Sequence, residues 1–259
     1  MQKTRSISVC MVSGAEAHRI GRALESVVSW TNEIIVVLNE DVRDGTEEIA
    51  RRFGAKVFRE PWKGFIGQKN SAAEKCTGPW LLNLDADEVV PSELASEIRQ
   101  VVGQTEGPQA AYEFPRCTYY CGRWIRHGDW YPDRVLRLYR NGAARWAGEE
   151  PHAYLQVRGR VGRLRSDLLH LSNESIARQI AKIAPYHSDF VKRRLAAGKS
   201  TGFFELAVRP PWRFLRAYFL RLGFLDGWPG FYIAALSAFS TLTRNAMVSE
   251  AKLPKPTSP

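Results

Sequence analysis

The sequence predicts an α/β protein in which a mostly parallel sheet carries helices on both faces. Three observations lead to this prediction. Apolar runs of strand length alternate with segments of helical periodicity between residues 6 and 102. The chain has 259 residues, which is enough for one large domain with an appendage. Its apolar fraction of 44% is ordinary for a globular protein.

Four short runs are expected to form the parallel strands, because they alternate with segments of helical length, an order typical of parallel βαβ units. The runs cover residues 6–12, 33–38, 55–60 and 80–85. The expected helices cover residues 17–30, 44–53, 67–76 and 91–102. Ligands bind beyond the carboxyl ends of the strands in such sheets, so the residues that follow each run are candidate site residues.

The character of the sequence changes after Gly107. The segment 111–140 is aromatic, rich in arginine and strand-like, with turns at glycines. Short strands are expected at 153–159 and 163–171, and a helix is expected at 175–197. The segment 210–248 is mostly apolar and is interrupted around 223–230. We therefore expect three parts, which cover residues 1–107, 108–172 and 173–259.

Charge is distributed unevenly along a chain whose formal net charge is +10. Acidic residues outnumber basic ones before Arg116, and the reverse holds after it. The planar guanidinium group of arginine matches the geometry of phosphate oxygens, so the second half is expected to bind an anionic partner: phospholipid, phosphorylated glycan or nucleic acid.

The four cysteines are too few and too scattered for a disulfide framework, which favours reduced thiols in a cytosolic protein.

Three acidic residues, Asp85, Asp87 and Glu88, lie at the carboxyl end of the fourth expected strand. An Asp-x-Asp at such a strand end is suited to hold Mg²⁺ or Mn²⁺ on a diphosphate, because these hard cations prefer oxygen ligands. The alternative is a solvated turn before a helix, to which Glu88 contributes. The position at the fourth strand end of a parallel sheet favours the cation site.

The runs "ISVCMVSGAE", "EIIVVLNEDVRDGTEEIARRFGAKVF" and "GFIGQKNSAAEKCTGPWLLNLDADEVV" resemble those of family 2 glycosyltransferases. The runs "WYPDRVLRLYR", "LLHLS" and "LRLGFLDGWPGF" resemble the bacterial branch that adds glucose to the lipopolysaccharide inner core. The resemblance implies a GT-A fold and metal-dependent inverting transfer of a hexose from a nucleotide diphosphate sugar, with UDP and glucose expected. It implies that 1–107 binds the nucleotide sugar and that 108–172 is the acceptor-binding half of the same domain. Residues 173–259 are expected to form a helical extension, which the composition described below predicts to be membrane-proximal.

The same resemblance implies which residues bind the donor. Asp87 is the expected direct metal ligand, and Asp85 lies near the ribose or the metal. Asn39 stands where the family usually has an aspartate that reads uracil, and its amide offers a different hydrogen-bonding pattern. Ala15 stands where the family usually has asparagine. The expected nucleotide-sugar contacts are Ser13, Glu16, Asn39, Lys69, Asp85 and Ala86.

An inverting transfer needs a carboxylate that takes the proton from the attacking hydroxyl. Glu150 is the favoured base, with Glu149 and Asp133 as the other candidates. Asp133 has an alternative, structural role, in which it holds Arg134 or Arg137 in place as an ion pair.

The acceptor is expected to be an anionic lipid-linked glycan such as lipopolysaccharide core. Aromatic rings suit sugar faces and guanidinium groups suit phosphates, and we expect Trp130, Arg134, Arg137 and His152 to contact the acceptor. Many relatives have His-Glu where this chain has His152 and Ala153. His170 is expected to pack in the interior.

No apolar run is long enough to span a bilayer. Residues 212–224 mix arginine with aromatic and aliphatic residues, which is typical of a helix in a membrane interface; the alternative is a hairpin packed on the domain. These features predict a peripheral protein on the cytoplasmic face of the inner membrane. Two other functions stay open: a catalytically inactive glycan-binding relative, or a basic nucleic-acid-binding module. The acidic strand end would repel nucleic acid, so no nucleic-acid partner is expected.

Overall fold

The computed structural model describes residues 6–104, 107–150, 152–172 and 175–253. It divides into two compact units. The first unit comprises residues 1–117 and 133–171, and the second comprises residues 118–132 and 172–259.

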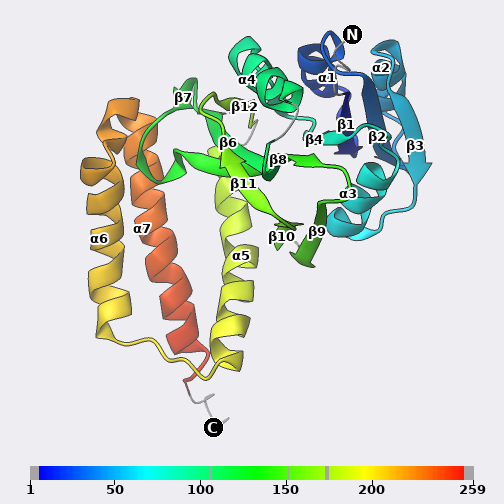
Figure 1. Ribbon diagram of the computed structural model, residues 1–259. Coiled ribbons are helices and arrows are strands. Elements are labelled where there is room, and N and C mark those ends of the chain that lie inside the picture. The colour runs from blue at the N-terminus through cyan, green and yellow to red at the C-terminus, as the bar shows by residue number, and fades with distance from the viewer. Residues whose placement is uncertain (1–5, 105–106, 151, 173–174, 254–259) are drawn as a thin grey trace. The chain divides into compact units, whose positions relative to one another are not determined.

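The first unit is built on a twisted sheet whose first four strands are parallel (Figure 1). In spatial order these strands are β3 (Lys56–Glu60), β2 (Glu33–Asn39), β1 (Ile7–Ser13) and β4 (Trp80–Asn83). The sheet continues with β8 (Asp133–Arg140), β6 (Gln109–Tyr120), β12 (Leu168–His170) and β5 (Glu88–Val89). The pairings of β4 with β8, of β8 with β6 and of β12 with β5 are antiparallel. The predicted α/β fold class is confirmed.

Side chains alternate between the two faces along each strand, so the apolar runs make both faces of this sheet apolar, and helices cover both. On β1, Val9 and Met11 belong to one core cluster, while Cys10 belongs to the other. The first cluster packs under α1 (Ile20–Val28), α2 (Thr46–Arg52) and α4 (Ser92–Gly103), and the second packs under α3 (Gly64–Glu74). Figure 1 shows the three helices on one side of the strands and α3 on the other.

A small antiparallel sheet adds to the α3 side. It pairs β9 (Ala144–Glu149) with β10 (His152–Val157), and its partly buried Leu155 and Val157 pack against the second core cluster. Asn70 on α3 fixes β9 through two hydrogen bonds: its amide donates to the Trp146 carbonyl, and its side-chain oxygen accepts from the Trp146 N–H, both at 2.9 Å. The short strand β11 (Arg160–Arg163) pairs with β6.

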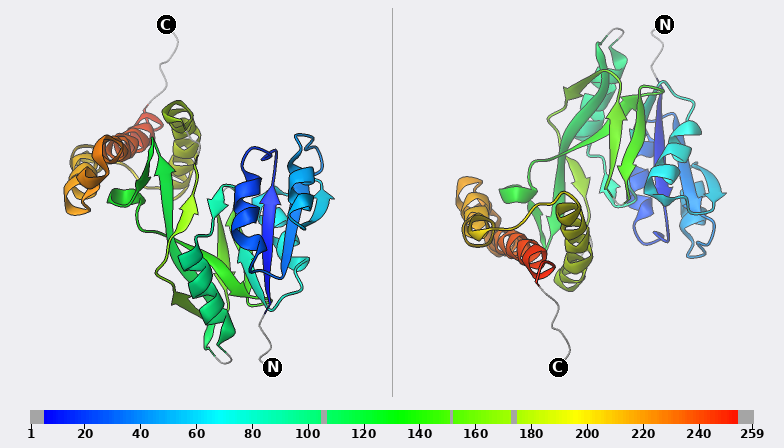
Figure 2. Two further views of the ribbon diagram at one scale, coloured as in Figure 1. Left: turned by 90° about the horizontal axis from the view of Figure 1, so that it is seen from above. Right: turned by 90° about the horizontal axis from the view of Figure 1, so that it is seen from below.

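The second unit is mainly helical. Its elements are β7 (Arg123–Ile125), η1 (Gly128–Trp130), α5 (Ile176–Ala196), η2 (Phe204–Val208), α6 (Arg209–Leu215), η3 (Arg216–Leu220), η4 (Gly223–Asp226) and α7 (Gly227–Glu250). The helix α7 packs against both α5 and α6, and the three run side by side in Figures 1 and 2. The predicted interruption of the apolar C-terminal segment is confirmed at η4. No helix in the described ranges combines the length and the hydropathy that a membrane span requires.

Candidate active site

A cavity of about 580 Å³ opens at the carboxyl ends of β1, β2 and β4. This is the edge of a parallel sheet at which ligands bind. Each strand ends in a loop that turns polar side chains toward the same space. The structure brings six of the sequence-predicted residues to the cavity wall: Glu16, Asn39, Lys69, Asp85, Ala86 and Asp87.

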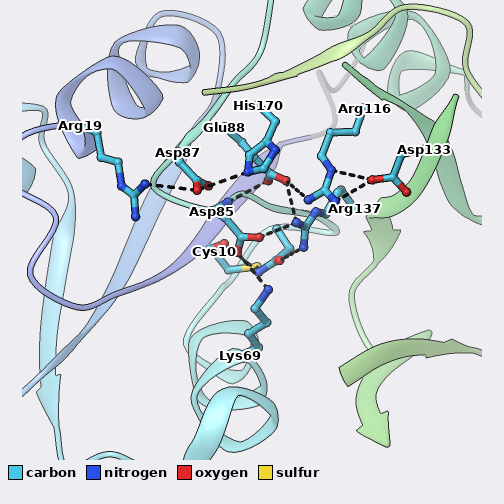
Figure 3. Close-up of polar contacts among 11 residues, drawn as sticks. Cys10, Arg19, Lys69, Asp85, Asp87, Glu88, Arg116, Asp133, Arg137 and His170 are labelled. Carbon is cyan, nitrogen blue, oxygen red and sulfur yellow. Dashed lines mark hydrogen bonds and ion pairs between the residues drawn. The ribbon is translucent and has the colours of Figure 1, made fainter. Parts of the chain in front are cut away.

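Asp85 is held between two cations (Figure 3). Lys69 Nζ lies 2.9 Å from its Oδ1, and Arg137 Nη2 lies 2.5 Å from its Oδ2. Burial disfavours the charged carboxylate, but the positive charges of Arg137 and Lys69 outweigh that effect and hold the pKa of Asp85 well below its usual range. Asp85 is therefore a fixed anion that positions Lys69 on the cavity wall.

Glu88 lies behind this pair and is fully buried. Its Oε1 accepts from Arg137 at 2.7 Å and from Arg116 at 3.4 Å, and its Oε2 accepts from the backbone N–H of Asp85 at 3.0 Å. A buried guanidinium needs compensating charge, and Glu88 supplies it from one side while Asp85 supplies it from the other. The third carboxylate of the acidic run thus fixes the loop that carries the other two.

Asp87 faces a different pair of side chains. Its Oδ2 lies 3.4 Å from Arg19 Nη1 and 3.4 Å from His170 Nε2. Burial raises the pKa of Asp87, but the hydrogen bond and charge of His170 and the charge of Arg19 bring it below its usual value. The pairing of β12 with β5, which sets His170 opposite Glu88, places the imidazole beside Asp87. Arg19 and His170 also line the cavity.

Lys69 is further restrained by an aromatic ring. Its Nζ lies 4.5 Å from the centroid of the Trp146 ring, within the range of a cation–π interaction. Trp146 is itself buried and fixed to α3 through Asn70. Lys69 therefore lies between the Asp85 carboxylate and the indole, and it has little freedom to leave the cavity.

The sequence model described as "Glycosyl transferase family 2" matches residues 8–168 of this chain. The match covers more than half of the chain and includes every residue named above on the cavity wall except His170. The chain belongs to glycosyl transferase family 2. It is a glycosyltransferase.

Curated relatives of this glycosyltransferase align over nearly its whole length. The glycosyltransferase RT0209 of Rickettsia typhi is 32% identical over 259 residues, which cover 96% of this chain and 88% of the relative. The lipopolysaccharide core biosynthesis glycosyltransferase LpsC of Rhizobium meliloti is 27% identical, with 93% of each chain covered.

Solved structures share the fold of the glycosyltransferase at low identity. The mannosyltransferase PcManGT of Pyrobaculum calidifontis, in complex with GDP-Man and Mn²⁺, matches with a TM-score of 0.55 and 11% identity over 95% of this chain and 88% of that one. TarS 1–349 of S. aureus, in complex with UDP-GlcNAc, matches with a TM-score of 0.53 and 15% identity over 95% and 91% of the two chains. These matches agree with the predicted GT-A fold.

The three base candidates of the glycosyltransferase are not on the cavity wall. Glu150 lies at the start of α3, where its Oε1 accepts from the Ile66 N–H at 2.8 Å. Gly64 makes room for it: φ is +79° there, and an added Cβ would lie 2.8 Å from the same Oε1. Glu149 is exposed. Asp133 lies 2.6 Å from Arg116, so its ion-pair partner is neither Arg134 nor Arg137.

The residues predicted for the acceptor are scattered. Arg137 is buried and binds the carboxylates of Asp85 and Glu88, so its guanidinium does not face an acceptor. Arg134 is exposed on the same strand. Trp130 belongs to the second unit and packs edge-on against Tyr120 at 5.1 Å. The side chain of His152 lies outside the described residues.

Ser13 is the one predicted donor contact away from the cavity wall, and its buried hydroxyl donates to the Gly14 carbonyl at 3.1 Å. Sequence reasoning missed Arg19 and assigned His170 to packing. For Arg19, the available signal was its position three residues after Glu16, with whose carboxylate it forms an ion pair. For His170, the signal is a strand pairing that the sequence does not reveal.

Proposed function

We propose that this glycosyltransferase carries out metal-dependent, inverting transfer of a hexose, with glucose expected, from UDP-sugar to lipopolysaccharide core or a related lipid-linked glycan. One observation carries the proposal: the cavity wall sets two carboxylates, Asp85 and Asp87, beside the cations Lys69 and Arg19. A diphosphate with a bound cation matches this alternation of charge. The similarity to LpsC supports the acceptor class.

We assign the nucleoside to the side of the cavity formed by Asn39, Trp62 and Phe65. The side-chain oxygen of Asn39 is buried and has no hydrogen-bond partner among the described residues, so it is available to an N–H of the base. Trp62 and Phe65 are half-exposed and pack edge-on at 4.9 Å, which leaves aromatic surface for stacking. Glu16 and Ala86 complete this wall, and Ser13 shapes the loop beneath it.

The residues present fit a divalent cation of the Mg²⁺ or Mn²⁺ type. Asp87 Oδ2 and His170 Nε2, 3.4 Å apart, offer one oxygen and one nitrogen donor on the same wall. In the described part of the chain no group of three or more His, Cys, Asp or Glu side chains is arranged to hold a metal. Two protein ligands suffice when diphosphate oxygens and water fill the remaining positions. The bound cation would neutralise charge on the departing diphosphate.

For the proton transfer we retain Glu150 ahead of Glu149 and Asp133. The hydrogen bond from Ile66 N–H places Glu150 next to Phe65, a residue of the cavity wall. Asp133 is engaged by Arg116. The acceptor would be held by exposed groups such as Arg134, with Trp130 and His152 as further contacts, and the enzyme would work on the cytoplasmic face of the inner membrane.

The proposed reaction is tested by nucleoside diphosphate release from a panel of nucleotide sugars. We expect release from UDP-glucose, in the presence of Mn²⁺ and lipopolysaccharide acceptor, to exceed release from GDP- and ADP-sugars. Product analysis should show the anomeric configuration opposite to that of the donor. Equal release without acceptor, or retention of configuration, would contradict the proposal.

The assignment of Glu150 predicts that Glu150→Gln loses about 100- to 10,000-fold in kcat, the usual contribution of general base catalysis. Affinity for UDP should change little, because the carboxylate does not line the donor cavity. Glu149→Gln is the matched control and should retain activity. The reverse ranking of the two variants in steady-state kinetics would move the assignment to Glu149.

A further inference from the structure

The second unit exposes large apolar side chains along α6, η3, η4 and the start of α7. Trp212, Leu220 and Trp228 are 54%, 66% and 60% exposed. Folded proteins seldom leave contiguous apolar area of this kind in water, and such area marks a surface that meets a partner or a membrane.

Five aromatic rings join this region into a continuous patch. Phe214 and Tyr218 stack with their centroids 5.4 Å apart. Three further rings pack edge-on against one or both of them at 5.0 to 6.4 Å. These three, Phe219, Phe224 and Phe231, are each about half exposed. We call the five residues the aromatic patch.

Three arginines of the segment that carries the aromatic patch contact one carboxylate, that of Asp129 in η1. Asp129 lies 2.7 Å from Arg213, 2.8 Å from Arg216 and 3.3 Å from Arg221. The Asp129 side chain is 3% exposed, whereas the three arginine side chains remain 34% to 49% exposed. One carboxylate cannot balance three guanidinium groups, so the cluster keeps two positive charges. We call Arg213, Arg216 and Arg221 the arginine trio.

The trio and the patch alternate along one stretch of chain. Arg213 and Arg216 flank Phe214, and Arg216 and Arg221 flank Tyr218 and Phe219. Partly exposed guanidinium groups beside half-exposed aromatic rings suit the boundary between lipid headgroups and acyl chains. Anionic headgroups would attract the surplus positive charge. A second copy of this chain fits less well, because a symmetric contact would bring the two trios together.

We propose that the aromatic patch and the arginine trio form a docking site for an anionic phospholipid bilayer. The patch enters the interface, and the trio binds headgroup phosphates. The inference extends the proposed function, because a lipid-linked acceptor lies at such a bilayer. Its test needs no turnover, so the docking site and the transfer reaction can fail separately.

The test is co-sedimentation of the full chain with vesicles. We expect the protein to pellet with vesicles of phosphatidylglycerol and phosphatidylcholine in equal parts, and to stay in solution with phosphatidylcholine alone. Raised NaCl should weaken the binding, because salt screens the trio. Failure to bind the anionic vesicles, or equal binding to both compositions, overturns the proposal.

Two double variants test whether the arginine trio accounts for the binding to anionic vesicles. Arg216→Gln with Arg221→Gln should weaken partition by about thirtyfold, from the usual contribution of basic residues near an anionic membrane. Arg22→Gln with Arg52→Gln removes the same charge from exposed positions of the first unit and should bind as the wild type.

Phe219→Ser with Leu220→Ser changes only exposed side chains, so it keeps the test decisive if the arginine variant fails to fold. It should weaken vesicle binding by about tenfold or more. Unchanged binding in this variant overturns the proposal. So does light scattering that shows a wild-type dimer which this variant dissociates, because the patch would then belong to a second copy.

Discussion

Replacing Asp87 with alanine is expected to lower the rate of sugar transfer by at least about 1,000-fold, because a metal-bound leaving group gains several kcal/mol from the cation. Lys69 and Arg137 both bind Asp85, whereas Asp87 lies 3.4 Å from Arg19 and from His170 and is the carboxylate that we assign to the cation. Its lowered pKa keeps it charged at neutral pH. The measurement is kcat/KM with UDP-glucose at saturating Mn²⁺.

A second variant, at His170, distinguishes the loss of metal binding from general damage to the fold. His170→Ala should lose less activity, about 10- to 100-fold, and excess Mn²⁺ should restore part of it, because one ligand remains. Glu48→Ala, on an exposed position of α2, is the matched control and should be unchanged. Wild-type activity in Asp87→Ala, with and without added Mn²⁺, would contradict the assignment of the cation site.

The parallel part of the fold was predictable because its determinants are local. Strand runs such as 33–38 are continuous and apolar, and the helices between them repeat apolar residues at three and four positions. The carboxyl ends of parallel strands meet at one edge, so the position of Asp85 and Asp87 at the end of the fourth run predicted that both would lie at that edge, where they line the cavity. Lys69 followed from the resemblance and lies beside Asp85 as an ion pair.

The remainder of the site depends on pairings between distant segments. Glu88 was expected to favour a turn, but Arg116 and Arg137 bind it across separations of 28 and 49 residues. His170 reaches Asp87 only because β12 pairs with β5. Neither contact has a local sequence signal.

Arg137 shows why a residue type alone did not indicate its role. Arg137 is the extra residue on β8 where the β6–β8 register shifts, because Tyr112 pairs with Leu138 and Glu113 pairs with Leu136. Arg137 is buried at this irregularity, whereas Arg134 lies outside it and is exposed. The sequence shows an arginine-rich strand suited to phosphates. It does not show which guanidinium is turned inward to meet two carboxylates.

That position makes the loss of Arg137 destabilising for the first unit. Arg137→Met is expected to lower the free energy of unfolding by about 3–5 kcal/mol, because Glu88 would stay buried, and Asp85 partly buried, without their shared cation. Urea denaturation at neutral pH measures the change. Arg134→Met, at an exposed position of the same strand, is the matched control and should shift stability by no more than about 0.5 kcal/mol.

Two further measurements identify the cause as uncompensated charge. Adding Glu88→Gln to Arg137→Met removes the charge of one carboxylate that has lost its Arg137 partner. The double variant should recover part of the lost free energy of unfolding. The pKa of Asp85 is lowered in the wild type, so stability from this ion pair is complete above the ordinary aspartate pKa of about 3.9 and is lost as pH falls below it. The difference between wild type and Arg137→Met should therefore be largest near neutral pH and narrow in acid. A difference independent of pH would instead indicate lost packing around the arginine stem.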